Sequence, residues 1–191
     1  MTSITIFGTG NMGQAIAGVL ARGGADIQHV GSSDTDARIA GDIVVLAVPY
    51  PALAAIADSY GDQLAGKTVV DITNPLDFST FDALVVPVGS SAAAGLQERL
   101  PEAKVLKAFN TNFAATLASG TVGGQPTTVL VAGDDAAAKT ALIDAVQAGG
   151  LAAIDAGALS RAHELEALGF LQLTLAASEK IGWTGGFTLA K

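Results

Sequence analysis

The chain has 191 residues, of which 50% are hydrophobic and 15% are charged, and its net charge is −8. This composition excludes an intrinsically disordered chain, and the apolar runs are too short to cross a membrane. The acidic balance argues against a nucleic-acid partner, and the absence of cysteine excludes disulfides and thiolate metal ligands. We expect a globular cytoplasmic protein without metal.

Strand-like and helix-like patterns alternate from one end of the chain to the other. Apolar runs predict strands at residues 3–8, 25–31, 42–48, 67–72, 104–110, 126–132 and 151–155. Helical spacing predicts helices at residues 11–22, 51–64, 91–100, 134–147 and 160–181. This alternation is typical of a doubly wound α/β fold with a mostly parallel, Rossmann-type sheet. We expect residues 1–191 to form one domain, with residues from about 150 to 191 as a docked C-terminal helical extension.

The connection between the second and third expected strands is unusually short. Only ten residues separate Gly31 from Asp42. A complete Rossmann half normally places a crossover helix and a further strand in this interval. The sequence therefore predicts a shortened connection after the second strand, reduced to a turn or one turn of helix.

A glycine-rich fingerprint follows the first expected strand. Gly8-Thr9-Gly10-Asn11-Met12-Gly13 has the spacing G-x-G-x-x-G and opens the first expected helix. The first glycine permits a tight turn, the second lets the backbone approach a pyrophosphate, and the third lets the helix pack on the strand. Free N–H groups at the helix N-terminus then bind the anion, even in an acidic protein. The pattern predicts a dinucleotide site.

The end of the second strand bears on the choice between NAD and NADP. NAD sites usually place a carboxylate here for the ribose hydroxyls. This chain instead has Gly31, Ser32 and Ser33, whose hydroxyls can donate to a 2′-phosphate, although Asp34 and Asp36 lie close by in sequence. We favour NADP as the cofactor over NAD.

Two further strand ends meet at the same edge of the predicted sheet, where ligands bind in this architecture. Ala47, Val48, Pro49 and Tyr50 would give an apolar surface for a nicotinamide ring. Asn74, followed by Pro75, either hydrogen-bonds ribose or carboxamide or serves as a turn residue. The wall facing the substrate is expected from Tyr50 and residues 74–78, 90–91, 109–112 and 183–187.

The remaining polar residues do not form a pattern typical of acid–base catalysis or metal binding. We expect surface or structural roles for His29 and His163. Lys107 either takes an edge or core-rim position, which we favour, or points at a substrate phosphate or carboxylate. Glu164 and Glu166 fall at the start of the last helix, where they favour its dipole. Trp183 and Phe187 either cover a bound ring, contact a second subunit or clasp the tail. No catalytic side chain is assigned.

The chain resembles a known family across nearly its whole length. The segments that carry the resemblance are Gly8–Gly13, Gly31-Ser32, Ala47–Pro49 and Lys107-Ala108-Phe109-Asn110-Thr111. They resemble the NADP oxidoreductase, coenzyme deazaflavin-dependent family, and the chain is similar to the reductase domain of the metazoan membrane ferric reductases. The resemblance implies that Thr9 lies beside phosphate and that Ser32 contacts the 2′-phosphate. Ser33 departs from the family, which usually has Arg there, and so does the shortened connection.

These observations predict an NADP-dependent oxidoreductase that transfers hydride to a small electron acceptor, of the flavin or deazaflavin kind. Hydride transfer between flat rings requires positioning more than a general acid. Two alternatives remain open: a non-catalytic NADP(H)-binding redox sensor, and an imine or 2-hydroxyacid reductase completed by a second subunit. We expect a homodimer.

Overall fold

A computed structural model describes residues 2–189, and its centre is a seven-stranded sheet in the order β2-β1-β3-β4-β5-β8-β9. The strands are β1 Ser3–Phe7, β2 Asp26–Val30, β3 Ile43–Leu46, β4 Thr68–Asp71, β5 Lys104–Lys107, β8 Thr128–Gly133 and β9 Ala152–Gly157. Neighbouring strands are parallel, except that β5 and β8 are antiparallel. The predicted α/β class with a mostly parallel sheet is confirmed.

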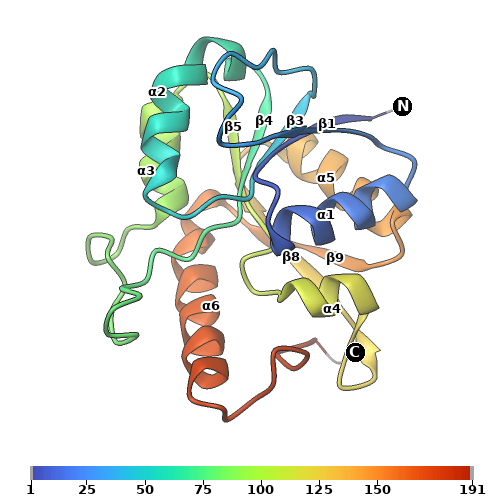
Figure 1. Ribbon diagram of the computed structural model, residues 1–191, viewed down its shortest axis with the longest axis vertical. Helices are drawn as coiled ribbons and strands as arrows, with labels where there is room; N and C mark the ends of the chain where they lie inside the picture. The colour runs from blue at the N-terminus through green and yellow to red at the C-terminus, as the bar shows by residue number, and fades with distance from the viewer. Residues whose placement is uncertain (1, 190–191) are drawn as a thin grey trace.

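Helices cover both faces of this sheet, as Figure 1 shows. They are α1 Asn11–Arg22, α2 Ala52–Leu64, α3 Ala92–Arg99, α4 Ala114–Ser119, α5 Ala136–Ala148 and α6 Ala162–Ala177, the last preceded by a 3-10 turn at Leu159–Arg161. None of the helices within residues 2–189 combines the length and the apolar character that a membrane crossing requires.

The core has two parts because successive strand residues point to opposite faces. In β3, Val45 packs in the cluster that contains α1 and α5, whereas Val44 packs in the cluster that contains α2 and α3. All four residues of β3 are buried. This two-sided burial explains why the central strands are continuous apolar runs rather than alternating ones.

The predicted short connection is confirmed, and β2 is an edge strand. Residues 31–42 contain no helix or strand. The loop is nevertheless tied to the domain by two glutamines. Gln28 donates to the Arg38 carbonyl and accepts from Ala40 N–H, and Gln63 accepts from Ile39 N–H. The missing helix and strand are therefore replaced by an anchored loop.

Two elements were missed by the sequence analysis. The strand expected at residues 104–110 ends at Lys107, because Phe109 has a left-handed backbone with φ 63° that cannot continue a strand. The short helix α4 and a small hairpin, β6 Thr121–Val122 with β7 Gln125–Pro126, then follow. A six-residue helix is too short to show helical periodicity.

The C-terminal helix α6 packs through a face that its leucines do not define. Leu165 is buried, but Leu171 is 49% exposed, while Glu166, Gly169 and Gln172 are buried. This polar face packs against polar groups at the carboxyl ends of β4 and β5, described below, rather than against an apolar core. The predicted helix of residues 160–181 thus begins as a 3-10 turn and its α-helical part ends at Ala177.

Candidate functional site

The turn between β1 and α1 contains three glycines with three different surroundings. A Cβ on Gly8, whose φ is +105°, would collide with the Ala47 carbonyl oxygen, and a Cβ on Gly13 would collide with the Gly8 carbonyl. A Cβ on Gly10 would meet no atom within 4 Å. Gly10 is also the N-cap of α1 and no side chain caps this end. The turn therefore offers open space and uncapped N–H groups, which suit an anion.

A cavity of about 560 Å³, here called the β2 cavity, lies on one side of this turn. Its floor comes from the ends of β1, β2 and β3, and α2 forms a wall. The lining residues include Gly8, Thr9, Gly10, Val30, Gly31, Ser32, Asp34, Thr35, Ala47, Val48, Pro49, Ile56 and Tyr60. The cavity is mainly apolar, and its hydroxyls come from Thr9, Ser32, Thr35, Ser59 and Tyr60.

The β2 cavity also contains a carboxylate that the sequence analysis treated only as a sequence neighbour. Asp34 Oδ2 accepts a hydrogen bond from Gly31 N–H at 2.7 Å. The expectation that no carboxylate occupies the end of β2 is therefore wrong. The reason is that the loop turns back after Gly31, so that Asp34 N–H donates to the Gly31 carbonyl at 3.1 Å and the side chain returns to the strand end.

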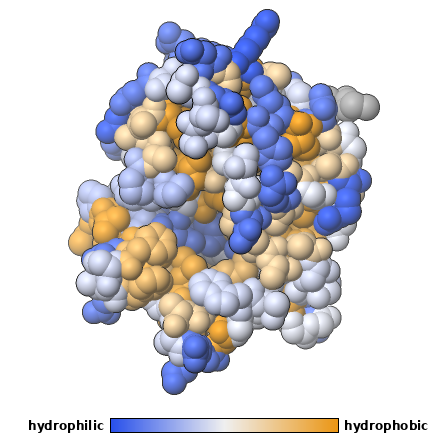
Figure 2. Space-filling view, viewed as in Figure 1, coloured by the Kyte–Doolittle hydropathy of each residue, from blue (hydrophilic) through white to orange (hydrophobic). Residues whose placement is uncertain are grey.

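A second cavity, of about 420 Å³, lies on the other side of the turn and is here called the β5 cavity. Its lining residues are Asn11, Met12, Ile72, Asn74, Phe109, Asn110, Asn112, Phe113, Ala114, Ala115, Leu173 and Trp183. Gly10 and Asn11 are consecutive, yet they line different cavities. The N-terminus of α1 therefore separates two adjoining hollows, and Figure 2 shows that this face of the molecule is hollowed at its centre.

Aromatic side chains and amides line the β5 cavity. Phe109 is fully buried and keeps its left-handed backbone, which is uncommon outside glycine and costs energy at a site that retains it. The amides of Asn74 and Asn110 bond to each other's oxygens, with Asn74 Nδ2 donating to Asn110 O and Asn110 Nδ2 donating to Asn74 Oδ1, each at 2.8 Å. The Phe113 and Trp183 rings pack with centroids 5.0 Å apart.

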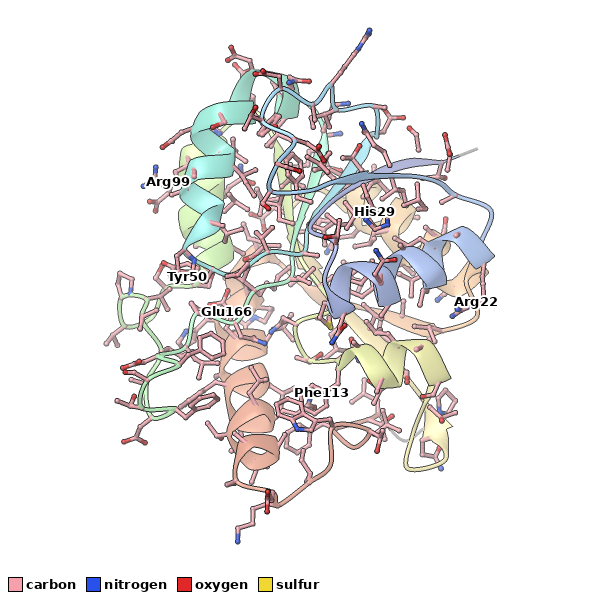
Figure 3. The ribbon with its side chains drawn as sticks, viewed as in Figure 1. Arg22, His29, Tyr50, Arg99, Phe113 and Glu166 are labelled. Atoms are coloured by element: carbon pink, nitrogen blue, oxygen red, sulfur yellow. The ribbon has the colours of Figure 1, made fainter. Side chains whose placement is uncertain are left out.

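A buried charge cluster supports the wall of the β5 cavity. Lys107 Nζ lies 2.9 Å from Asp71 Oδ2 and 2.8 Å from Glu166 Oε1, and it also donates to the Thr73 carbonyl. Burial raises the pKa of Glu166, while Lys107 acts in the opposite direction. Glu166 also accepts from Ala92 N–H and Ala93 N–H, at the N-terminus of α3. Figure 3 shows Glu166 at the upper end of α6, below α3.

Two expectations are wrong at this cluster. Lys107 lies neither at an edge nor at the core rim, because its side chain is fully buried between two carboxylates. Glu166 stabilises the N-terminus of α3 rather than that of its own helix, because α6 turns this residue inward. Glu164, in contrast, lies in the first turn of α6, as expected. Its side chain is half-exposed and pairs with Arg161.

Helix α6 holds the cavity wall at three further points. Asn110 Nδ2 donates to the Leu165 carbonyl at 2.8 Å, and Gln172 Nε2 donates to the Thr111 carbonyl at 3.2 Å. A Cβ on Gly169 would collide with Asn74 Oδ1 and Asn110 O. Gln172 Oε1 accepts from Phe187 N–H at 3.0 Å, so the tail is attached to the same helix. Helix α6 and the C-terminal tail, which are distant in sequence from β4 and β5, therefore hold the wall of the β5 cavity in place.

The candidate residues fall into three groups. Gly8, Thr9, Gly10, Gly31, Ser32, Ala47, Val48 and Pro49 line the β2 cavity, and Asn11, Met12 and Asn74 line the β5 cavity. Tyr50 lines a separate pocket beside Leu96 and Arg99, Pro75 is buried, and Gly13 packs beneath the turn. Ser33 is exposed on the loop and is not among the residues lining these cavities. Thr35, Ile56 and Tyr60 were missed, because single residues on a loop and a helix carry no sequence signal.

The two histidines lie away from both cavities. His29 is in the edge strand β2 and is half-buried. His163 is exposed on α6, and its Nδ1 lies 3.1 Å from the Ser90 carbonyl oxygen. Neither histidine is among the described residues that line the cavities.

The Rossmann-type sheet and the glycine turn between two cavities are typical of dinucleotide-binding proteins. Residues 27–75 match the family described as NADP oxidoreductase, coenzyme F420-dependent. The chain is 32% identical over 171 residues to the F420-dependent NADP reductase of Methanocaldococcus jannaschii, covering 87% of this chain and 76% of that protein. The chain belongs to this family, which confirms the predicted class, an NADP-dependent oxidoreductase.

Two more relatives agree with this assignment. The chain is 33% identical over 126 residues to the metalloreductase STEAP3 of Rattus norvegicus, covering 66% of this chain and 24% of that protein. A crystal structure from Arthrobacter sp. FB24, of a candidate F420-dependent NADP reductase, superimposes with a TM-score of 0.85 and 28% identity, and both chains are covered completely. The predicted resemblance is confirmed for both the deazaflavin-dependent family and the ferric reductase domain.

Proposed function

We propose that this protein binds NADP(H) across the N-terminus of α1 and transfers hydride to a small acceptor of the flavin or deazaflavin kind. One observation carries the proposal: Gly10 and Asn11 open onto two different cavities, so a single dinucleotide can place one half on each side of the turn. The space above Gly10 and the uncapped N–H groups of α1 fit the pyrophosphate between the halves.

The adenosine half would occupy the β2 cavity. Apolar side chains such as Ile56 and Val48 offer contact to a flat base, and the hydroxyls of Thr9, Ser32 and Thr35 would bind the 2′-phosphate. The described residues lining this cavity include no Lys or Arg. Backbone N–H groups and hydroxyls would therefore hold the phosphate.

The nicotinamide half would occupy the β5 cavity, where Asn74 and Met12 face it from two elements. We place the ring here rather than on Ala47, Val48, Pro49 and Tyr50, because the first three line the β2 cavity and Tyr50 lines a separate pocket. When bound, NADPH supplies a hydride, and the acceptor takes that hydride together with a proton from solvent. The protein's part is to hold two rings in register and to exclude water between them.

The chemistry of the β5 cavity wall supports a ring-shaped acceptor. Trp183 offers aromatic surface and packs on the buried Phe113, and the amides of Asn11 and Asn74 lie beside it in the cavity lining. Aromatic walls favour flat ligands, and amides can orient them by hydrogen bonds. The similarity to F420-dependent reductases favours a deazaflavin among such rings.

The test is to follow NADPH absorbance with the purified protein and a panel of acceptors. The panel contains a deazaflavin, flavins, quinones, ferric chelates, cyclic imines and keto acids. Turnover with the deazaflavin or a flavin supports the proposal. Tight NADPH binding without turnover of any acceptor would instead favour the redox sensor, and turnover of imines or keto acids that disappears on dilution would favour a reductase completed by a second subunit.

The predicted homodimer is part of the same proposal. Leu171, Trp183, Phe187 and Leu189, in α6 and the segment after it, are exposed apolar side chains that a second copy of the chain could cover. Sedimentation of the protein at two concentrations measures the oligomeric state, and a monomer at both concentrations would contradict the homodimer. The cytoplasmic location stays a prediction from the sequence.

A further inference from the structure

The loop that replaces the missing helix and strand holds Asp34 through three hydrogen bonds at the end of β2, where it lines the β2 cavity. The Asp34 N–H donates to the Gly31 carbonyl at 3.1 Å, and Asp34 Oδ2 accepts from Gly31 N–H at 2.7 Å. The Asp34 carbonyl accepts from the Tyr60 hydroxyl at 2.7 Å. Tyr60 is itself buried on α2 and packs edge-on against Phe7, with ring centroids 5.0 Å apart. The position of this carboxylate is therefore set by the fold.

The negative charge of Asp34 affects which coenzyme the β2 cavity can bind. Asp34 is the one charged side chain among the described residues that line the β2 cavity. A 2′-phosphate carries about −1.5 to −2 charges at neutral pH, so the carboxylate repels it across the cavity. Asp34 also occupies the Gly31 N–H, a donor that a phosphate at this strand end could otherwise use. Arg38, the nearest cation in sequence, is exposed and does not line the cavity.

The same carboxylate suits a ribose without the phosphate. In many dinucleotide folds a carboxylate at the end of the second strand accepts hydrogen bonds from the two free ribose hydroxyls. Asp34 offers Oδ1 for this purpose while Oδ2 bonds to Gly31. The shortened loop brings it back to this strand end from four residues beyond Val30.

We propose that Asp34 sets the coenzyme specificity of this protein, weakening its preference for NADP(H) so that NAD(H) also serves as a coenzyme. The inference rests on the proposed dinucleotide site. Three features of Asp34 have the same effect on coenzyme choice. Its charge and its hydrogen bond to Gly31 N–H disfavour the 2′-phosphate, and its Oδ1 favours the 2′-hydroxyl.

The experiment compares the dissociation constants of NADPH and NADH by calorimetry for the wild-type chain and for Asp34→Asn. The asparagine keeps an oxygen for Gly31 N–H but removes the charge. We expect the wild-type protein to bind NADH within about tenfold of NADPH, and Asp34→Asn to shift the ratio toward NADPH by at least about fivefold. The matched control is Asp36→Asn, an exposed carboxylate of the same loop that does not line the cavity. It should change the ratio less than about twofold at physiological salt.

A shift below fivefold in Asp34→Asn, or an equal shift in Asp36→Asn, would overturn the inference while leaving the proposed function intact. If the wild-type protein binds neither NADPH nor NADH, the result would overturn both this inference and the proposed function. If circular dichroism shows that Asp34→Asn does not fold, Asp34→Ser is measured by the same criterion, since serine also keeps a short acceptor for Gly31 N–H.

Discussion

Lys107 Nζ lies 2.8 Å from Glu166 Oε1, so a fully buried ion pair joins the last residue of β5 to helix α6. The pair connects segments that are distant in sequence and stands behind the wall of the β5 cavity. It explains how a C-terminal helix can position a cavity that is built mainly by the sheet and its loops.

Replacing Glu166 by glutamine should destabilise the protein by about 1.5–3 kcal/mol, because it removes the ion pair with Lys107 and weakens the acceptor for Ala92 N–H, although Asp71 still balances the Lys107 charge. Urea unfolding at neutral pH measures the loss. The matched control is Glu164→Gln, two residues away, whose pair with Arg161 is half-exposed and should contribute less than about 1 kcal/mol. Equal losses in the free energy of unfolding for both variants would show that the buried pair stabilises the protein no more than the exposed one.

Replacing Gly169 by alanine should destabilise the protein by about 1–3 kcal/mol, since the added Cβ would collide with the Asn74 side chain and the Asn110 backbone. The same urea titration applies. Gly95→Ala in α3 is the control, because its Cβ would meet open space, and it should be neutral or stabilise the helix by up to about 1 kcal/mol. A neutral Gly169→Ala would mean that α6 can move away from the amide pair without cost.

Replacing Gly10 by valine should leave the fold intact and weaken NADPH binding by at least about a hundredfold. The side chain would extend into the open space that we assign to the pyrophosphate, and the extended backbone of Gly10 suits valine. Calorimetry measures binding and circular dichroism checks the fold. Gly18→Val in the same helix, where a Cβ would meet only the end of the Arg22 side chain, should bind NADPH normally. Retained binding in Gly10→Val would contradict the placement of the coenzyme.

Replacing Ser32 by aspartate should weaken NADPH binding by about tenfold or more and NADH binding far less. The new carboxylate would stand in the β2 cavity beside the expected 2′-phosphate. The control is Ser160→Asp, an exposed serine of the 3-10 turn, which contacts β8 and β9 rather than β2. A parallel loss for both coenzymes would indicate that Ser32 does not face the phosphate.

Asp155 should make its full contribution to stability only above the pKa it has in the unfolded chain. The hydrogen bond from Lys139 and then that from Gly157 N–H lower the pKa of Asp155 in the folded state. A depressed pKa stabilises the fold at neutral pH, and this contribution is lost as the pH falls through the folded pKa.

Because the Asp155 side chain is 52% exposed, screening limits the loss in Asp155→Asn to about 0.5–1 kcal/mol at neutral pH. The difference from wild type should shrink as the pH falls below about 3.9. Urea unfolding at both pH values measures it, with exposed Asp144→Asn of α5 as the control. A difference that grows toward low pH would contradict the sign of this pKa shift.

The sequence by itself determined the architecture and the first part of the site. Continuous apolar runs such as Ile43–Leu46 are typical of strands in a sheet covered on both faces, and the glycine spacing of residues 8–13, after an apolar strand and before a helix, is typical of a tight strand-to-helix turn. Even the missing helix and strand could be predicted, because ten residues between Gly31 and Asp42 are too few to form them. These features depend on local chain geometry and on the period of the hydrophobic pattern.

Only the tertiary structure decided which distant groups meet. Lys107, Asp71 and Glu166 come from three elements, and nothing in the sequence around Glu166 shows that it faces α3. In the same way, Asp34 returns to the end of β2 because the loop closes on Gly31 and Tyr60. Charges buried or fixed by contacts across the fold leave no periodic signal along the chain, so their partners follow from packing alone.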